Sequence, residues 1–300
     1  MAKAVYVGVG SKARKMKKAY IGIGGTARKV KKMYIGVGGK ARLCYSAEAD
    51  KFGTATPLSK YRIFLAGTTV GGYALFGGGG YDSDARKGEA IMDAYNASLT
   101  RTTATPLPSN AYACAGGTVG GYAVFSGGSS MNSDSTLVET IGALEIVRAY
   151  DSSLTSSQAA PLSYPRAVHS AATIGNHLLL AGGYNSTTGK YLSTVESYDA
   201  SLTRSTAVEL SSAKNGLASA TVGEYAMFAG GYKGNSDAAY VATVDAYNTA
   251  LTKTTMPDLS VGRHGLASAV IGDYALFAGG ISKISSTIDQ YQDVVDVYSA

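Results

Sequence analysis

A motif built on a Gly-Gly doublet recurs five times along most of this chain of 300 residues. Its copies read YALFGGGGY at 73–81, YAVFSGGS at 122–129, HLLLAGGY at 177–184, YAMFAGGY at 225–232 and YALFAGGI at 274–281. The first glycines of the doublets lie at 78, 127, 182, 230 and 279, so successive copies are 49, 55, 48 and 49 residues apart. A period of this length predicts a solenoid, a propeller or an array of stacked units.

Every unit contains four short runs of mostly apolar residues. In the fourth unit they are LASATVG (217–223), the doublet motif itself, ATVDAYN (242–248) and LTKTTMPDL (251–259). The runs are β-branched and aromatic in content and are bounded by Gly, Asn, Asp or Ser, which predicts four strands joined by turns. The doublet run is apolar without alternation, as expected of a strand covered on both faces. Radial stacking of the units buries those faces, so we expect an all-β propeller.

Residues 47–300 resemble a kelch-type β-propeller. Three features carry the resemblance: the Gly-Gly doublet after the second strand, an aromatic residue that closes the third, and a basic residue before the next first strand. The aromatic residues are Tyr95, Tyr150, Tyr198, Tyr247 and Tyr298, and the basic residues are Arg62, Arg166, Lys214 and Arg263, with Ala111 as the exception. Kelch repeats carry a Trp in the fourth strand, but this chain has none, and Ser-Leu-Thr segments such as 98–102 and 201–205 take its place. The repeats therefore resemble a bacterial, prophage-type branch of the family.

The last unit ends with VDVYSA, after its third strand, so its fourth strand must come from elsewhere. The segment AEADKFGTATPLSKYR (47–62) matches the fourth-strand segment TRTTATPLPSNA of the first unit. We expect residues 53–58 to form the outer strand of the last blade, which removes two open sheet edges. This closure gives five four-stranded blades. An alternative has six blades, with the basic N-terminal residues as a four-stranded sixth.

Residues 1–46 form a separate module with a period of 14 residues, marked by Tyr6, Tyr20 and Tyr34. In the third copy Met33, Ile35 and Val37 alternate with Tyr34 and Gly36, which predicts a strand, and a Gly-Gly turn and a second strand follow. We expect the three copies to form a small β-meander. Residues 1–45 hold 12 Lys/Arg and no acid, a charge of +12, whereas the remaining 15 Lys/Arg face 21 acids, a charge of −6.

Three roles for the basic module stay open. The first is nucleic-acid binding, in which cations neutralise phosphates and tyrosines stack on bases. The second is contact with an anionic cell-surface polymer or membrane. The third is attachment of the propeller to an assembly or to copies of itself, since a charge run is usually a solvated face. The repeats resemble the starts of prophage and tail-associated proteins. The residues expected to contact an anion or an assembly are Arg14, Lys15, Arg28, Lys29 and Arg42.

The sequence offers no pattern for a cofactor, a metal or covalent catalysis. GVGGKAR (36–42) fails the phosphate-loop pattern because position 34 is Tyr and position 41 is Ala. The three histidines, His169, His177 and His264, form no ligand motif, and Cys44 and Cys114 make no disulfide framework. Because no catalytic pattern is present, we expect a non-enzymatic protein. No stretch reads as a secretion signal or a transmembrane helix, so we expect it in the bacterial cytoplasm or in a phage virion or tail.

Ligand contacts are expected in the loops between second and third strands, because loops vary while strands repeat. These loops are rich in Tyr, Asn, Asp and Ser, which suit a glycan or a polar protein surface. The candidate contacts are Tyr81, Asp82, Asp84, Asn132, Asp134, Tyr184, Asn185, Tyr232 and Asn235. The alternative is a carbohydrate-active enzyme that uses loop carboxylates such as Asp82, Asp84 or Asp134.

Overall fold

The structure is a computed structural model that divides into two compact units, residues 1–54 and 55–300. It describes residues 55–80, 88–130, 142–234, 239–285 and 288–299, and the strand backbone within 6–46. Side chains of residues 284, 285, 288 and those in the first unit are outside this description. The described residues are all-β, as expected, and contain no helix long and apolar enough to cross a membrane.

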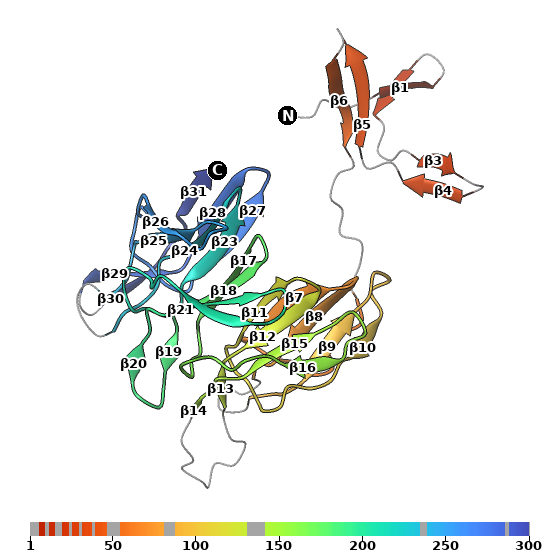
Figure 1. Ribbon diagram of the computed structural model, residues 1–300. Helices are drawn as coiled ribbons and strands as arrows, with labels where there is room; N and C mark the ends of the chain where they lie inside the picture. The colour runs from red at the N-terminus through yellow and green to blue at the C-terminus, as the bar shows by residue number, and fades with distance from the viewer. Residues whose placement is uncertain are drawn as a thin grey trace. The chain divides into compact units, whose positions relative to one another are not determined.

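The second unit is built from five antiparallel sheets, which we call blades 1 to 5 in chain order (Figure 1). Blades 1 to 4 have four strands each among the described residues, paired in the order first-second-third-fourth. Blade 1 holds β7 (Ala66–Val70), β8 (Tyr73–Gly77), β9 (Met92–Tyr95) and β10 (Arg101–Thr103). Blade 2 holds β11 (Ala115–Val119), β12 (Tyr122–Ser126), β15 (Val147–Tyr150) and β16 (Ser156–Gln158).

The remaining blades repeat this plan. Blade 3 holds β17 (Ser170–Ile174), β18 (His177–Ala181), β21 (Val195–Asp199) and β22 (Arg204–Ala207). Blade 4 holds β23 (Ala218–Val222), β24 (Tyr225–Ala229), β25 (Val244–Tyr247) and β26 (Lys253–Met256). Blade 5 has three strands among its described residues, β27 (Ala267–Ile271), β28 (Tyr274–Ala278) and β31 (Val295–Ser299). Small hairpins fill three loops between second and third strands: β13 (Ser129–Ser130) with β14 (Gly142–Ala143), β19 (Tyr184–Asn185) with β20 (Lys190–Tyr191), and β29 (Ile281–Ser285) with β30 (Ile288–Tyr291).

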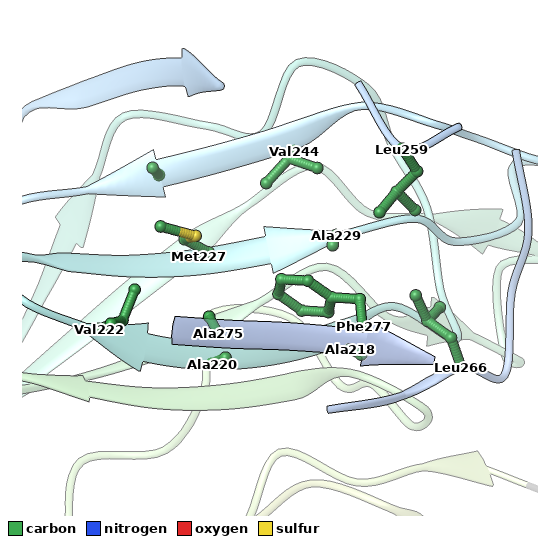
Figure 2. Close-up of a cluster of buried hydrophobic side chains, with 11 residues drawn as sticks. Ala218, Ala220, Val222, Met227, Ala229, Val244, Leu259, Leu266, Ala275 and Phe277 are labelled. Atoms are coloured by element: carbon green, nitrogen blue, oxygen red, sulfur yellow. The ribbon is translucent and has the colours of Figure 1, made fainter. Parts of the chain in front are cut away.

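The hydrophobic core lies between neighbouring blades. Figure 2 shows one of these clusters, in which Met227, Ala229 and Val244 of blade 4 face Ala275 and Phe277 of blade 5. The same pairing recurs between blades 1 and 2, 2 and 3, and 3 and 4. Each of blades 2 to 4 therefore buries one face against the blade before it and the other against the blade after it, which explains why the second strand is apolar throughout.

In blades 1, 3, 4 and 5 an ion pair joins the segment before the first strand to the third strand of the same blade. The side chains of Arg62 and Asp93 are fully buried 3.0 Å apart, Arg166 and Glu196 2.7 Å apart, and Lys214 and Asp245 3.3 Å apart. In blade 5, Arg263 lies 2.8 Å from Asp296. In blade 2 both members of the pair change, because Ala111 replaces the basic residue and Arg148 stands at the position of the acid. The change at Ala111 therefore leaves no buried acid without a basic partner in blade 2, because the acid is also absent there.

Blades 1 and 5 each leave one apolar face uncovered among the described residues. Blade 1 has an open cavity of about 690 Å³ on this face, and its lining includes Ala74, Phe76, Tyr95 and Leu99. The equivalent residues of blade 2 are instead covered, because they pack against blade 1. In blade 5, Ile271, Val295 and Val297 are exposed on the opposite face. The predicted outer strand at 53–58 is not found: residues 55–58 are not in a strand, and residues 53–54 lie outside the described residues. The reason is register, since 55–58 (ATPL) correspond to 104–107, which follow β10 rather than belong to it.

The first unit consists of three separate hairpins: β1 (Tyr6–Val9) with β2 (Lys12–Lys15), β3 (Tyr20–Ile23) with β4 (Thr26–Lys29), and β5 (Lys32–Val37) with β6 (Lys40–Ser46). The prediction of two strands in each 14-residue copy is confirmed, and the two strands of each copy pair with one another. The predicted meander and the alternative of a four-stranded sixth blade are not confirmed, because the described strands of this unit form three separate two-stranded sheets. Lysines and arginines occupy β2 and β4, and charged edge strands of this kind resist further pairing.

Candidate functional site

The loops between second and third strands form the candidate binding face. Of the candidate contacts expected there, Tyr184, Asn185 and Tyr232 are among the described residues. Six others lie outside them: Tyr81, Asp82, Asp84, Asn132, Asp134 and Asn235. Tyr184 pairs in the backbone with Ala167, and Tyr232 with Asn215, so the repeat places both tyrosines at equivalent points beside the start of their own blade.

Five partly buried rings form a continuous strip across blades 3 to 5, which we call the aromatic band. Its members are Tyr184, Tyr191, Tyr232, Tyr240 and His264. The ring centroids of Tyr184 and Tyr191 are 5.0 Å apart, and those of Tyr191 and Tyr232 are 5.6 Å apart. Tyr232 lies 5.5 Å from Tyr240 and 5.6 Å from His264. The band therefore joins the β19–β20 hairpin to the entry of blade 5.

The carboxylate of Asp289 extends the band into the loop of blade 5. The Tyr240 hydroxyl donates to Asp289 Oδ1 at 2.8 Å. Loss of solvent, together with the Asp289 charge, raises the pKa of Tyr240 to about 12, so this phenol stays protonated at neutral pH. Burial lowers the pKa of His264, with Asp289 opposing that shift, so the neutral imidazole is favoured. The band thus presents neutral rings beside one exposed carboxylate, and the described residues supply no charged nucleophile within it.

Asn185 stabilises the turn of the β19–β20 hairpin. Its side chain is buried, and Oδ1 accepts hydrogen bonds from the backbone N–H groups of Thr187 and Thr188 at 3.0 and 3.1 Å. The sequence prediction missed Tyr191, Tyr240 and His264. The two tyrosines are the last aromatic residues of their loops, and His264 follows Arg263, the basic residue that recurs before the first strand of a repeat.

An axial pocket of about 250 Å³ lies where the starts of the five blades meet. It is lined by Phe64, Leu65, Ala113, Cys114, Val168, His169, Gly216, Leu217, Gly265 and Leu266. Backbone hydrogen bonds link the blades here, from Ala113 N to Phe64 O, Val168 N to Ala113 O, Gly216 N to Val168 O and Gly265 N to Gly216 O. The band reaches this pocket, because a Cβ at Gly216 would lie 3.3 Å from His264 Nδ1.

The backbone at the pocket mouth is left-handed at all five equivalent positions. Gly216 and Gly265 have φ of 63° and 64°, but Phe64, Ala113 and Val168 have φ of 54°, 54° and 56°. The left-handed region costs a non-glycine residue roughly 1–2 kcal/mol, and a β-branched residue there is a rare outlier. The pocket mouth therefore holds strained side chains where the fold also accepts glycine.

The thiol and the imidazole of the pocket are unsuited to nucleophilic chemistry. Burial raises the pKa of Cys114 to about 11, so the thiolate is scarce at neutral pH. Burial and the nearby Arg166 lower the pKa of His169 to about 3, and His169 Nε2 lies 2.9 Å from Ser126 Oγ. Among the described residues no group of three or more His, Cys, Asp or Glu side chains is arranged to hold a metal ion.

The basic residues of the first unit occupy matching positions in the three hairpins. Arg14 pairs with Val7, Arg28 with Ile21 and Arg42 with Ile35 across each hairpin. Lys15 and Lys29 pair with Tyr6 and Tyr20. The three hairpins therefore repeat the same backbone register, with each arginine opposite an aliphatic residue.

Comparison with known proteins agrees with the fold. The Kelch motif family matches residues 165–201, which cover β17, β18 and β21 of blade 3. A solved structure described as "Structure of YjhT" superposes with a TM-score of 0.63 over 95% of this chain and 92% of that chain, at 15% identity. No curated protein matches the chain in sequence.

The sheets, the Kelch motif and this structural likeness together support a kelch-repeat β-propeller. A propeller of this class points to a binding or structural role, in which the strands form a scaffold and the loops meet the partner.

Proposed function

We propose that this propeller is a non-enzymatic binding protein whose loop face, centred on the aromatic band, binds a glycan or a polar protein surface. The observation that carries the proposal is the contact chain from Tyr184 through Tyr191 and Tyr232 to Tyr240 and His264. Tyrosine supplies an apolar face together with a hydroxyl, and it is enriched where proteins bind polar partners. Asp289, which is exposed at the end of the band, adds an acceptor for hydroxyl or amide donors.

A screen of the full chain on a glycan array and on immobilised cell-surface proteins tests this function. We expect saturable binding to a small set of related glycans or to one protein surface. The Tyr232→Ala variant should lose that binding, because Tyr232 contacts three other rings of the band. The Tyr164→Ala variant is the control, since Tyr164 is 51% exposed and stands outside the band. Absence of binding to every glycan and protein surface would contradict the proposal.

The alternative of a carbohydrate-active enzyme rests on Asp82, Asp84 and Asp134. Turnover of chromogenic glycosides that is lost in the Asp→Asn variants would favour this alternative over the binding function. The described part of the band contributes neutral rings and a single carboxylate, whereas glycoside hydrolysis generally uses a pair of carboxyl groups. Binding is therefore the function that the described residues support better.

For the first unit we propose attachment of the propeller to a prophage or tail-like assembly or to further copies of the chain. The support is the threefold repetition of one basic hairpin, since repeated equivalent hairpins suit a repeated partner surface. Arg14, Lys15, Arg28, Lys29 and Arg42 would make the contacts. Nucleic-acid binding is the competing role, and it predicts affinity for DNA or RNA that falls steeply with salt and disappears without residues 1–46. Tail genes beside the gene for this chain would support the assembly role.

A further inference from the structure

We propose that the outer edge of β31 in blade 5 binds an extended segment of a partner protein, which supplies a fourth strand to this blade. The segment carries a basic residue, then Ser or Thr, then Thr, then an apolar residue. No member of the aromatic band lies on β31, so this site is separate from the band. Two features carry the proposal: an open backbone edge, and two acceptors that hold the basic residue of the fourth strand in other blades.

The backbone of β31 has an open edge. It pairs with β28 on one side, and no described strand pairs with it on the other, whereas the third strand of blades 1 to 4 lies between two strands. In blade 1, Ala104 N donates to Met92 O on this outer side, and Met92 is the residue equivalent to Val295 of β31. Backbone groups alternate along a strand, so Val295 and Val297 turn their N–H and C=O groups toward the open edge.

Strand β31 lacks the features that usually protect such an edge. Its sequence, VDVYS, holds no lysine and no proline, and no register shift interrupts its pairing with β28. The side chains of Val295 and Val297 are 50% and 56% exposed. An open edge rich in β-branched residues is a template for a further strand, whose backbone hydrogen bonds supply much of the affinity.

The first acceptor is a backbone carbonyl at the base of the blade. In three blades the side chain of the first residue of the fourth strand donates to such a carbonyl: Arg101 to Pro57, Arg204 to Pro161 and Lys253 to Glu209. The equivalent residue in blade 5 is Asp258, which precedes Ser260 by two positions as Glu209 precedes Ser211. The Asp258 carbonyl therefore stands where a basic side chain from a fourth strand would donate.

The second acceptor is the carboxylate of Asp296. In blades 1 and 4 the equivalent carboxylates have a second cation from the fourth strand, with Arg101 3.8 Å from Asp93 and Lys253 3.7 Å from Asp245. Both of those carboxylates are inaccessible to solvent, whereas the side chain of Asp296 is 17% exposed. That exposure leaves room for a second cation beside Asp296, in addition to its partner Arg263.

Blade 2 shows that the basic residue and the acid belong together. Arg148 stands at the position of the acid in its third strand, and its fourth strand begins with Ser156 instead of a basic residue. Because Asp296 keeps the acid, blade 5 calls for a strand that begins with Lys or Arg. A second copy of β31 has neither residue, so it does not meet this requirement.

The fourth strands of blades 3 and 4 define the remaining chemistry of the partner. They read RSTA and KTTM, and their last residues, Ala207 and Met256, pack partly against the core between blades. Within this chain, residues 52–54 correspond in sequence to β10, but they read FGT, hold no basic residue and lie outside the described residues. The better match is therefore a partner segment of the type basic, Ser or Thr, Thr, apolar.

A peptide copied from blade 4 tests the edge. The probe is a fluorescein-labelled peptide with the sequence of residues 250–258, ALTKTTMPD, which contains β26. We expect a saturable rise in its fluorescence anisotropy with the full chain, and at least fivefold weaker binding of the same peptide with the Lys253→Glu change. Absence of saturable binding, or equal binding of the two peptides, would overturn the proposal.

Two variants at one position of the full chain provide the matched pair. Val297→Pro removes an N–H from the outer edge and keeps the pairing with β28, because proline is tolerated on an edge strand whose N–H faces solvent. Val297→Thr keeps that N–H and a β-branched side chain. We expect peptide binding at least tenfold weaker in Val297→Pro and within threefold of the parent in Val297→Thr. Equal affinity in a folded Val297→Pro variant would overturn the proposal, and if that variant does not fold the two peptides still decide it.

Hydrogen exchange of the full chain locates the bound peptide. We expect the amides of Val295 and Val297 to exchange at least fivefold more slowly when the peptide is bound. Saturable binding without this change would place the peptide elsewhere and overturn the proposal. Protection of these amides in the free chain equal to that of Val244 and Ala246, their equivalents in blade 4, would also overturn it. Sedimentation would then assign the cover to a second copy if the chain is a dimer, and to the chain itself if it is a monomer.

Discussion

Arg166 and Glu196 meet in the interior of blade 3, with the guanidinium 2.7 Å from the carboxylate and both side chains inaccessible to solvent. Burial lowers the pKa of Arg166, and Glu196 opposes that shift. Glu196 also accepts a hydrogen bond from the backbone N–H of Ser163 at 2.9 Å. The pair therefore ties the segment before β17 to β21, as its equivalents do in blades 1, 4 and 5.

Removal of one partner of this pair should be costly. We expect Arg166→Met to lower the free energy of unfolding by about 3–5 kcal/mol, because it leaves the Glu196 carboxylate buried and uncompensated. The Arg166→Met/Glu196→Leu double variant should recover most of that loss, as the paired change at Ala111 and Arg148 in blade 2 indicates. Urea unfolding followed by circular dichroism measures both. A single variant that costs less than 1 kcal/mol, or a double variant worse than the single, would contradict this account.

His169 should make the protein less stable in mild acid. Its pKa is lowered to about 3 by burial and by Arg166, whereas the unfolded chain takes up the proton near pH 6.5. Between these values the unfolded state binds more protons, so this contribution to stability is present above pH 6.5 and is lost as the pH falls. The steepest loss is about 1.4 kcal/mol per pH unit.

The Ser126→Ala/His169→Leu variant isolates this contribution of His169. The fold uses Ala at the positions equivalent to Ser126 in blades 3 to 5 and Leu at those equivalent to His169 in blades 1, 4 and 5, so the variant should fold. The unfolding temperature of the parent should fall more steeply than that of the variant between pH 6.5 and 4.5. Parallel curves would mean that His169 is not buried as a neutral ring.

The end blades should open more readily than the middle ones. Strands β24 and β28 have nearly the same sequence, YAMFA and YALFA, and both lie between two strands of their sheet. Blade 4 is covered on both faces, whereas blade 5 leaves one face exposed. We expect amide protons of β28 to exchange with solvent at least tenfold faster than those of β24, because local opening follows the loss of buried contacts. Equal protection in a hydrogen-exchange experiment would show that blade 5 is covered in solution.

Repetition is the reason that the fold was predictable and the site was not. Five copies of one motif predicted the strand order of blades 1 to 4, and the 14-residue period predicted each hairpin of the first unit. The prediction of a strand at residues 55–58 is wrong because these residues match 104–107, which follow β10 and are not part of it. The predicted meander failed because local alternation determines a hairpin but says nothing about pairing between hairpins.

The site depends on contacts between repeats, which a single sequence does not display. Tyr184 and Tyr232 were expected from loop composition alone. Tyr191 links the two blades, because its ring lies 5.6 Å from that of Tyr232 in blade 4, and Tyr240 joins through Tyr232 of its own loop and through His264 of blade 5. His264 enters the band through its position at the start of blade 5, where no local pattern marks it as a binding residue.

The aromatic band as a binding surface is the central claim, and a binding isotherm tests it most directly. The measurement is calorimetric titration of the strongest ligand from the array into the full chain, into Tyr232→Ala and into Tyr164→Ala. Loss of one central ring of a binding surface costs on the order of 2 kcal/mol, so we expect Tyr232→Ala to bind about 30-fold more weakly. Tyr164→Ala should bind like the parent. Equal affinity in all three proteins would contradict the claim that the band meets the ligand.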